Sequence, residues 1–598
     1  MSKWMLYSKK ADFNAIAREL NISPVTARVI RNRDVIGAEA TRRYLQGTMA
    51  DLDDPESLPG LRDAAFVLRR KILSGAAIRV IGDYDVDGIC STYILWRLIS
   101  FLGGKVSCAI PERIRDGYGI NERLVLEAVA DGVDTIVTCD NGIAAAEPLR
   151  LAKEAGLTVI VTDHHEIPYV EEAGGSVRRY DYPPADVIAE PWIPDEATGK
   201  PIARFPNICG AAVVYKLAMI LLGKPDLTMP KTKDEPAVTA LARELLGFAG
   251  IATVCDVMPL QDENRILVRW GLQEATNTDN IGLRSLILAA GLGKEPLTVY
   301  HAGFVIGPCL NASGRLDTAM RALALFQERD ERQAMLMARD LKQLNDSRKS
   351  MTEEGRQKAL QQVEEDIAAG RPLSDRRVLV VRVDDCHESL AGIIAGRLRE
   401  YYQRPVIVLT KAEEAGLLKG SGRSVEAYDM FGEMNRCRDL FVKFGGHRMA
   451  AGLTIAEENA VQLDRRLNES CTLTEEEMAE VLHIDMELPP SFVTKDLARE
   501  LELLEPCGTA NPKALFVTRN LTLHRTAVFG KNRNVIRFDG LDAKGTQYDF
   551  VWFLPETELP DFLQSGSAVC NVVYEPKRSV WRGRESVQFV IKDIRRQI

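Results

Sequence analysis

Four short motifs in the first half of the chain concentrate carboxylate and imidazole side chains. They are Asp83-Tyr84-Asp85-Val86-Asp87, Asp140-Asn141-Gly142, Asp163-His164-His165 and Cys255-Asp256. Carboxylates repel one another at short range, and a group this dense is stable when one or two divalent cations lie between its members. The motifs therefore predict a metal site, and the chemistry of that metal would define the function.

The spacing of Asp83, Asp85 and Asp87 allows two interpretations. In an extended chain these side chains point the same way, as ligands of one ion would, and Gly88 permits a tight entry into a following helix. Alternatively, the aspartates form a turn that caps a helix starting near Ile89. An EF-hand calcium loop is excluded, because the glycine and the distant glutamate that it needs are missing.

The triplet Asp163-His164-His165 favours the metal interpretation. A mixed shell of carboxylate and imidazole fits Mn²⁺ better than Ca²⁺, and the absence of cysteine ligands disfavours structural zinc. Asp140 and Asp256 would complete two coordination shells. Two ions about 3.5–4 Å apart would share one carboxylate, activate a water molecule and stabilise both sides of an in-line displacement at phosphorus.

Strands and helices alternate around these motifs. Residues 78–81, 135–138 and 158–161 are apolar and strand-like, whereas residues 88–102 and 143–155 are helix-like. Such alternation indicates a parallel sheet that is buried on both faces and binds ligands at the carboxyl ends of its strands. Because the first three acidic motifs each follow a strand, we expect them to meet at one edge of the sheet.

A charged helix is expected over residues 318–368, with Ala334, Met337, Leu341 and Leu344 as its buried stripe. It would connect two lobes. The expected domains are a helical lead-in (1–50), a first α/β domain (51–317), the connecting helix (318–370), a second α/β domain (371–470) and a β-barrel (471–598). In the second α/β domain we expect strands at 378–381 and 406–409 and a helix at 393–402. Alternating apolar and polar residues near 571–574 and 587–591 predict the barrel.

The composition is that of a globular protein with several cores. The chain has 598 residues, of which 46% are hydrophobic and 27% charged. Eleven scattered cysteines indicate reduced thiols and a cytoplasmic location, and the longest apolar stretch, residues 208–223, contains Lys216 and is short for a membrane span. A net charge of −9 argues against a wholly basic nucleic-acid binder but allows a local basic channel.

Taken in order, the extended motifs resemble those of the DHH phosphoesterase superfamily. The matching segments are Gly82-Asp83-Tyr84-Asp85-Val86-Asp87-Gly88, Cys139-Asp140-Asn141-Gly142, Asp163-His164-His165 and Ala252-Thr253-Val254-Cys255-Asp256-Val257-Met258-Pro259-Leu260. The chain is most similar to the exonuclease branch that degrades single-stranded DNA from the 5′ end. That resemblance implies a parallel-sheet DHH domain, a smaller α/β DHH-associated (DHHA1) domain joined to it by a long helix, and a C-terminal OB-type barrel.

The resemblance also implies roles for the motif residues. The implied metal ligands are Asp85, Asp87, Asp140, His164 and Asp256, with Asp83 either a ligand or a base beside them. Asp140 would bridge two ions, His165 would face the scissile phosphate, and Asp163 would orient the two histidines. The implied cofactor is Mn²⁺, as two ions, with Mg²⁺ also supporting activity.

A further set of residues would bind the DNA and its 5′-phosphate. It comprises Arg113 and Tyr118 (in Arg-x-x-x-Gly-Tyr-Gly), Asn311 and Arg315, Ser421 and Arg423, and Gly445-Gly446-His447. Structural alternatives exist: Arg113 or Arg315 could form a surface ion pair, and Gly420-Ser421-Gly422 could be a flexible turn. The segment Cys386-His387-Glu388-Ser389-Leu390-Ala391-Gly392 departs from the family pattern, because only the histidine of Trp-His-x-Gly-Val is kept.

In the barrel, basic side chains and a tryptophan could form a groove for single-stranded nucleic acid. These residues are Lys577, Arg578, Trp581, Arg582 and Arg584. The tryptophan could equally pack the barrel.

The implied function is metal-dependent 5′→3′ degradation of single-stranded DNA to mononucleotides in repair and recombination. A channel between the lobes would exclude duplexes, and a RecQ-type helicase and a single-strand-binding protein would be partners of a monomeric enzyme. Two alternatives remain: another DHH phosphodiesterase that acts on nanoRNA or cyclic dinucleotides, or a non-catalytic replication scaffold.

Overall fold

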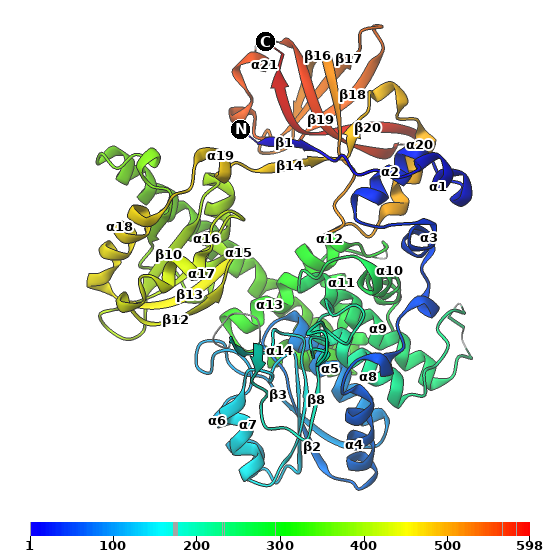
Figure 1. Cartoon of the computed structure of the whole chain (residues 1–598), viewed down its shortest axis with the longest axis vertical. Coiled ribbons are helices and arrows are strands. Elements are labelled where there is room, and N and C mark those ends of the chain that lie inside the picture. The colour runs from blue at the N-terminus through cyan, green and yellow to red at the C-terminus, as the bar shows by residue number, and fades with distance from the viewer. Residues whose placement is uncertain are drawn as a thin grey trace.

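The computed structural model describes residues 2–171, 178–229, 231–232, 234–293, 295–564, 566–581 and 583–597. The chain forms three lobes (Figure 1). The first lobe contains the sheet that follows the N-terminal helices, the second lobe lies to its side, and the barrel lies at the opposite end of the molecule, where both termini are found. The mixed α/β architecture with a C-terminal barrel confirms the expected fold class.

The sheet of the first lobe is fully parallel. Its strands, in spatial order, are β3 (Lys105–Ala109), β2 (Ala77–Ile81), β4 (Thr135–Cys139), β5 (Thr158–Thr162) and β8 (Val187–Ala189). Helices cover both faces, so alternate strand residues enter different cores. Val80 and Val137 pack with α4 (Leu61–Leu73), α5 (Val86–Phe101) and α8 (Gly210–Leu221). Ile81 and Ile136 pack with α6 (Glu122–Ala130) and α7 (Ala146–Glu154).

A helical layer follows the sheet and completes the first lobe. It contains α9 (Ala237–Cys255), α10 (Asp262–Thr276), α11 (Ile281–Ala289), a π-helical turn at residues 302–306, α13 (Gly307–Leu316) and α14 (Met320–Gln327). By length and composition α9 could cross a membrane, but 72% of its apolar window is buried inside the structure. A Cβ on its Gly250 would lie 2.8 Å from the Cα of Gly271 in α10, so the two helices pack backbone to backbone. Helix α9 is therefore a core helix.

The connecting helix, α15 (Glu331–Ala368), has 38 residues and is about 57 Å long. Of the four residues predicted to be buried, Ala334 and Leu341 are buried. Met337 and Leu344 are only partly buried, and the residues that follow them, Ala338 and Asn345, are buried instead. The prediction assumed the spacing of a coiled coil, but the helix packs against the first lobe with its N-terminal part and against the second lobe with its C-terminal part. The predicted start at residue 318 was also wrong, because α14 is a separate helix.

The second lobe has a five-stranded mixed sheet. Its order is β12 (Phe441–His447), β13 (Ala450–Ala456), β11 (Leu417–Arg423), β10 (Val406–Lys411) and β9 (Leu379–Arg382), with α16 (Ala391–Tyr402), α17 (Met430–Asn435) and α18 (Ala460–Ser470) beside it. Gly420-Ser421-Gly422 lies within the central strand β11, so the flexible-turn alternative is wrong. A Cβ on Gly420 would meet Leu409 at 2.6 Å and Leu453 at 3.0 Å. The glycine therefore lets the leucines of both neighbouring strands close over it.

The C-terminal sheet closes on itself as a barrel. Its strands are β15 (Met486–Glu487), β16 (Phe516–Phe529), β17 (Val535–Leu541), β18 (Gln547–Trp552), β20 (Arg584–Arg596) and β19 (Ser567–Trp581), and β19 pairs back onto β16. The N-terminal helices α1 (Phe13–Leu20), α2 (Pro24–Asn32) and α3 (Ala38–Gln46) pack beside it, and Ile30 and Tyr44 share its core. The lead-in contains these expected helices and also a strand that was not expected, β1 (Lys3–Leu6), which pairs with β14 (Val481–Ile484).

A buried ion pair joins the N-terminal helices to the base of the barrel. Arg33 donates to both carboxylate oxygens of Asp485, at 2.6 and 3.0 Å, and both side chains are almost fully buried. Removing the arginine would leave an uncompensated buried carboxylate. We expect Arg33→Ala to lower the free energy of unfolding by about 3–5 kcal/mol in denaturant titrations.

Arg31→Ala is the matched control, because Arg31 pairs at 3.5 Å with the exposed Asp34 on the same helix end. It should cost about 1 kcal/mol or less. Equal losses for the two variants would contradict a structural role for the buried pair.

Candidate metal and anion sites

The first acidic motif lies at the start of a helix rather than in an extended segment. Asp83 follows β2, the carboxylate of Asp85 caps α5 by accepting from the N–H of Gly88 (3.1 Å), and Asp87 lies in the first helical turn. Of the two interpretations left open by the sequence, the capping one holds for Asp85, and the chain is not extended as far as Asp87. The helix start still directs the carboxylates to the carboxyl edge of the sheet.

Three of the expected carboxylate ligands converge on the imidazole of a fourth ligand, His164. Nε2 of His164 lies 3.0 Å from Oδ1 of Asp140, 3.5 Å from Oδ2 of Asp87 and 3.7 Å from Oδ2 of Asp256. Possible ligand atoms of Asp83, Asp85 and Asp140 also lie within 4.8 Å of one another. All six expected ligands thus gather in two adjoining groups (we call them the carboxylate cluster), and Asp140 approaches both.

Asp140 occupies its position through an unusual backbone conformation. Its φ is 60°, in the left-handed region, which aspartate tolerates better than most residues. Its carbonyl oxygen accepts a hydrogen bond from the hydroxyl of Tyr118 at 2.7 Å. This turn points the carboxylate away from β4 and toward His164.

Asp87 is held by backbone N–H groups that were not predicted from the sequence. Gly210 and Ala211, at the start of α8, donate to the two carboxylate oxygens at 2.6 and 2.8 Å. A helix N-terminus favours negative charge, so this contact holds the carboxylate in place at the start of α8. A Cβ on Gly210 would lie 2.8 Å from Cβ of Asp140 and 3.1 Å from Oδ2 of Asp87. A glycine is required there, but backbone donors leave no residue-type signal in a sequence.

The electrostatics of the carboxylate cluster favour bound cations. Burial, reinforced by the neighbouring carboxylates, raises the pKa of Asp83 to about 8 and raises the pKa values of Asp85, Asp140 and Asp256. Oδ2 of Asp256 is buried and has no hydrogen-bond partner among the described residues. Burial lowers the pKa of His164, which keeps its imidazole neutral and able to bind a metal. Oxygen and imidazole donors in this number fit Mn²⁺ or Mg²⁺.

His165 lies beside this cluster and differs from His164 in charge. Its Nδ1 is 2.8 Å from Oδ1 of the buried Asp163, which also accepts from the N–H of Ile143 at 2.9 Å. Burial alone would lower the pKa of His165, but Asp163 raises it to about 9. The ring is 44% exposed and 3.0 Å from the hydroxyl of Tyr118. A protonated, half-exposed imidazole so placed can donate to a phosphate oxygen.

A second site, which we call the arginine pocket, lies between the first and second lobes. Its volume is about 210 Å³, and its lining includes Arg113 and Arg315 from the first lobe and Ser421 and Arg423 from the second. Burial, and then the neighbouring guanidinium groups, lowers the pKa of Arg315 to about 9 and lowers that of Arg423. Guanidinium groups this close together repel one another, so the pocket is built to receive an anion.

Neutral acceptors orient two of these arginines. Arg315 donates to the carbonyl oxygen of Ser389 at 2.8 Å, and Arg423 donates to Oγ of Ser421 at 3.0 Å. Among the described residues, neither Arg113 nor Arg315 forms the surface ion pair of the alternative interpretation. A Cβ on Gly392 would lie 2.8 Å from both Arg423 and Ser421, so this glycine keeps the pocket open.

Part of the pocket lining was not predicted from the sequence. The additional residues are Ile114, Glu388, Ser389, Gly392, Lys419, Gly452 and Leu453. Glu388 and Lys419 form an ion pair at 2.9 Å at its wall. The segment that departs from the family pattern therefore contributes to this site, and Lys419 stands next to the predicted Gly-Ser-Gly.

The other expected DNA-binding residues lie outside the lining of the arginine pocket. Asn311 is on α13, one turn before Arg315, so both face the same side of the helix. Gly445, Gly446 and His447 lie on β12, an exposed edge strand two strands from Ser421, rather than in the arginine pocket.

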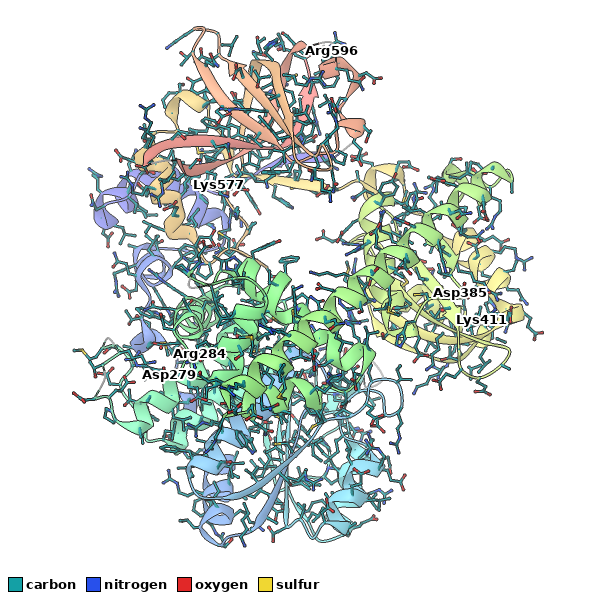
Figure 2. All side chains as sticks on the ribbon, turned by 180° about the vertical axis from the view of Figure 1, so that it is seen from behind. Asp279, Arg284, Asp385, Lys411, Lys577 and Arg596 are labelled. Carbon is teal, nitrogen blue, oxygen red and sulfur yellow. The ribbon has the colours of Figure 1, made fainter. Side chains whose placement is uncertain are left out.

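The expected basic groove of the barrel is only partly described. Lys577 is exposed at the barrel edge nearest the other lobes (Figure 2), and Arg584 is exposed as well. Arg578 pairs with Glu502 at 2.7 Å. Arg582 and the side chain of Trp581 lie outside the described residues.

The fold and the carboxylate cluster define a DHH-type phosphoesterase. Family models match the chain in three places: the DHH family N-terminal domain over residues 77–249, the DHHA1 domain over 375–472 and the RecJ OB domain over 484–593. The chain belongs to the RecJ family. The expected resemblance to the exonuclease branch of the superfamily is confirmed.

Individual relatives agree with this assignment. The chain is 32% identical to the single-stranded-DNA-specific exonuclease RecJ of Bacillus subtilis, over 99% of this chain and 70% of that protein. It is 31% identical to that of Dickeya dadantii, over 95% of each. It also resembles the crystal structure of RecJ in complex with Mn²⁺ from Thermus thermophilus, with a TM-score of 0.79 and 26% identity, over 100% of this chain and 80% of that one.

The fit of Gly210 against two carboxylates can be tested directly. Gly210→Ala should displace Asp87 or Asp140, because the added Cβ would overlap both. We expect Mn²⁺ affinity, measured by calorimetry, to fall by about 10-fold or more.

The control for this substitution is Gly303→Ala. A Cβ there meets its nearest neighbour, Val254, at an ordinary 3.5 Å. Unchanged Mn²⁺ affinity in Gly210→Ala would show that the start of α8 does not hold the ligands.

Proposed function

We propose that the protein is a metal-dependent exonuclease that degrades single-stranded DNA from the 5′ end to mononucleotides. One observation carries the proposal: the arginine pocket adjoins the carboxylate cluster. Tyr84 lies between Asp83 and Asp85, and the guanidinium of Arg113 stacks over its ring at 4.7 Å. An anion in the pocket and a phosphodiester at the cluster are therefore separated by little more than one side chain. The names and metal-bound structures of the relatives support the same activity.

The carboxylate cluster would hold two divalent ions, and Asp140, which belongs to both groups of the cluster, would be among their ligands. Bound there, the ions would supply charge stabilisation and an activated water for displacement at phosphorus. Mn²⁺ is the ion we propose, because the cluster mixes carboxylates with imidazole, and Mg²⁺ is the alternative. Solved RecJ structures contain each of these metals.

The chain's own residues would orient the phosphate. His165, protonated through its contact with Asp163, would donate to a non-bridging oxygen of the scissile phosphate. Tyr118 would fix the position of the His165 imidazole relative to the backbone of Asp140, since its hydroxyl contacts both. These groups are fixed before substrate arrives, so little reorganisation is needed during the reaction.

The arginine pocket would set the polarity. A terminal phosphate carries more charge than an internal phosphodiester, and three guanidinium groups match the additional charge. Ser421 and Arg423 would bind the 5′-phosphate from the second lobe, and Arg113 and Arg315 from the first. Placing the terminal phosphate there leaves the next phosphodiester for the carboxylate cluster, which would release one nucleotide per cycle.

The alternatives fit the chain less well. A phosphodiesterase for nanoRNA or cyclic dinucleotides would not need the barrel, which here matches the RecJ OB model. A non-catalytic scaffold would not need six gathered ligands. Partnership with a RecQ-type helicase and a single-strand-binding protein, a monomeric state and a cytoplasmic location remain predictions from the sequence.

A polarity assay tests the proposal. Single-stranded DNA labelled at either end should lose its 5′ label first, as a mononucleotide, and only when Mn²⁺ or Mg²⁺ is present. Asp140→Ala should abolish the release. Asp279→Ala, at an exposed position at the outer edge of the first lobe (Figure 2), should leave it unchanged. Early loss of the 3′ label would reverse the assigned polarity.

The arginine pocket gives a second test. Because a hydrogen bond to a charged group contributes about 1.5–3 kcal/mol, Arg423→Ala should reduce the preference for a 5′-phosphate over a 5′-hydroxyl by about 10- to 100-fold. Competition between the two substrates measures it.

Arg397→Ala is the control, since that arginine is 42% exposed and pairs with Glu353. A preference that survives in Arg423→Ala would place the 5′ end elsewhere.

A further inference from the structure

The ligand Asp256 lies at a strained helix end. It caps the C-terminus of α9, and the following residue, Val257, has a φ of 59°. A β-branched side chain in the left-handed region is strongly disfavoured, and Val257 is also 65% exposed, so its own packing does not compensate. Other contacts must therefore hold this helix end in place.

Asn264 supplies the most direct of these contacts. It lies fully buried in the first turn of α10, and its Nδ2 donates to the carbonyl oxygens of Pro259 (3.1 Å) and Asn207 (2.5 Å). Pro259 is three residues after the ligand Asp256. One amide therefore ties the loop after α9 to the loop before α8.

The second of these loops leads directly to another ligand. Three residues after Asn207, the N–H groups of Gly210 and Ala211 hold the carboxylate of Asp87. The side chains of Asp87 and Asp256 meet at His164, at 3.5 and 3.7 Å. The amide of Asn264 thus joins the backbone supports of two carboxylates that converge on the same imidazole.

Segments leading into the barrel fix the other side of the Asp256 loop. The N–H of Leu260 donates to the carbonyl oxygen of Thr509 at 2.8 Å, and Nε2 of Gln261 donates to that of Ala510 at 3.1 Å. Within the linker to the barrel, the guanidinium of Arg265 donates to the carbonyl oxygens of Leu503, Leu504, Glu505 and Pro506. Asn264 is therefore held between a rigid support and the two loops.

We propose that Asn264 is a positioning residue for the metal site, acting on Asp87 and Asp256 through the backbones of the loops at Asn207 and Pro259. It touches neither the ligands' carboxylates nor substrate. The inference rests on the proposed metal-dependent function, and it adds the device that sets the distance between two ligands from different helices.

The test compares two buried asparagines of the first lobe. Asn264→Ala removes the link between the loops. Asn280→Ala is its matched control: Nδ2 of Asn280 donates to the hydroxyl of Tyr93 (2.7 Å) and the carbonyl oxygen of Phe326 (2.9 Å), away from the metal ligands. Calorimetric titration with Mn²⁺ and the Mn²⁺-induced rise in melting temperature are measured on both full-length variants.

Asn264→Ala should bind Mn²⁺ about 10- to 100-fold more weakly and lose most of the Mn²⁺-induced rise in melting temperature. Asn280→Ala should lose stability but keep both properties of the wild type. At saturating Mn²⁺ the kcat of Asn264→Ala should return to the wild-type value, and its KM for DNA should equal that of the wild type. Equal Mn²⁺ affinity in the two variants would overturn the proposal.

If Asn264→Ala does not fold, Gln261→Ala serves in its place. It removes only the partly exposed amide between the Asp256 loop and the barrel linker, and it should weaken Mn²⁺ binding in the same direction but by less. Wild-type Mn²⁺ affinity in that variant would also overturn the proposal. A wild type that binds Mn²⁺ but releases no nucleotide would instead contradict the proposed function.

Discussion

Six acidic and imidazole side chains packed within a few ångströms cannot all keep their ordinary charge in a dry interior. Burial and mutual repulsion raise the pKa values of the aspartates, so the cluster has two stable forms: protonated, or neutralised by cations. The surrounding structure favours the second form. Backbone N–H groups at the start of α8 donate to both carboxylate oxygens of Asp87, and burial keeps His164 neutral by lowering its pKa. In the absence of metal, the contacts around the cluster hold its carboxylates together against their mutual repulsion.

The two histidines show how neighbouring residues acquire opposite roles. His164 faces carboxylates that a metal would share, and burial lowers its pKa. His165 faces Asp163, whose carboxylate is fixed by the N–H of Ile143, and its pKa rises. The difference comes from the partner of each ring rather than from its position in the chain. One imidazole is suited to bind a cation and the other to bind an anion.

The sequence predicted what side-chain types and strand order determine. Parallel strands place the residues that follow them at one edge, so the meeting of Asp83, Asp140 and Asp163 could be expected. Whether Asp83, Asp85 and Asp87 are extended or cap a helix depends on where α5 begins, which the local pattern left open. The N–H donors at Gly210 and the link through Asn264 could not be predicted, because backbone partners carry no residue-type signal. Strand β1 was missed because its partner is β14, far along the chain.

The arginine pocket shows that the relative position of the lobes is part of the site. Arg113 and Arg315 come from the first lobe, and Ser421 and Arg423 from the second, so no single lobe contains the pocket. Three guanidinium groups meeting across an interface push the lobes apart. Within the described part of the chain, no carboxylate pairs with these arginines in the way that Glu388 pairs with Lys419. Helix α15 opposes this repulsion, since it packs on both lobes and its Gly355 lies against Ile394 of α16.

A bound anion would replace this repulsion between the lobes with attraction. Placed among the arginines, it attracts both lobes at once, and it does so most strongly when it carries the charge of a terminal phosphate. Under the proposed function, binding a strand end would therefore also stabilise the arrangement of lobes that sets the distance from the arginine pocket to the carboxylate cluster. An internal phosphodiester, with less charge, would do this less well. End selection would then follow from the charge balance of the interface as well as from the shape of the pocket.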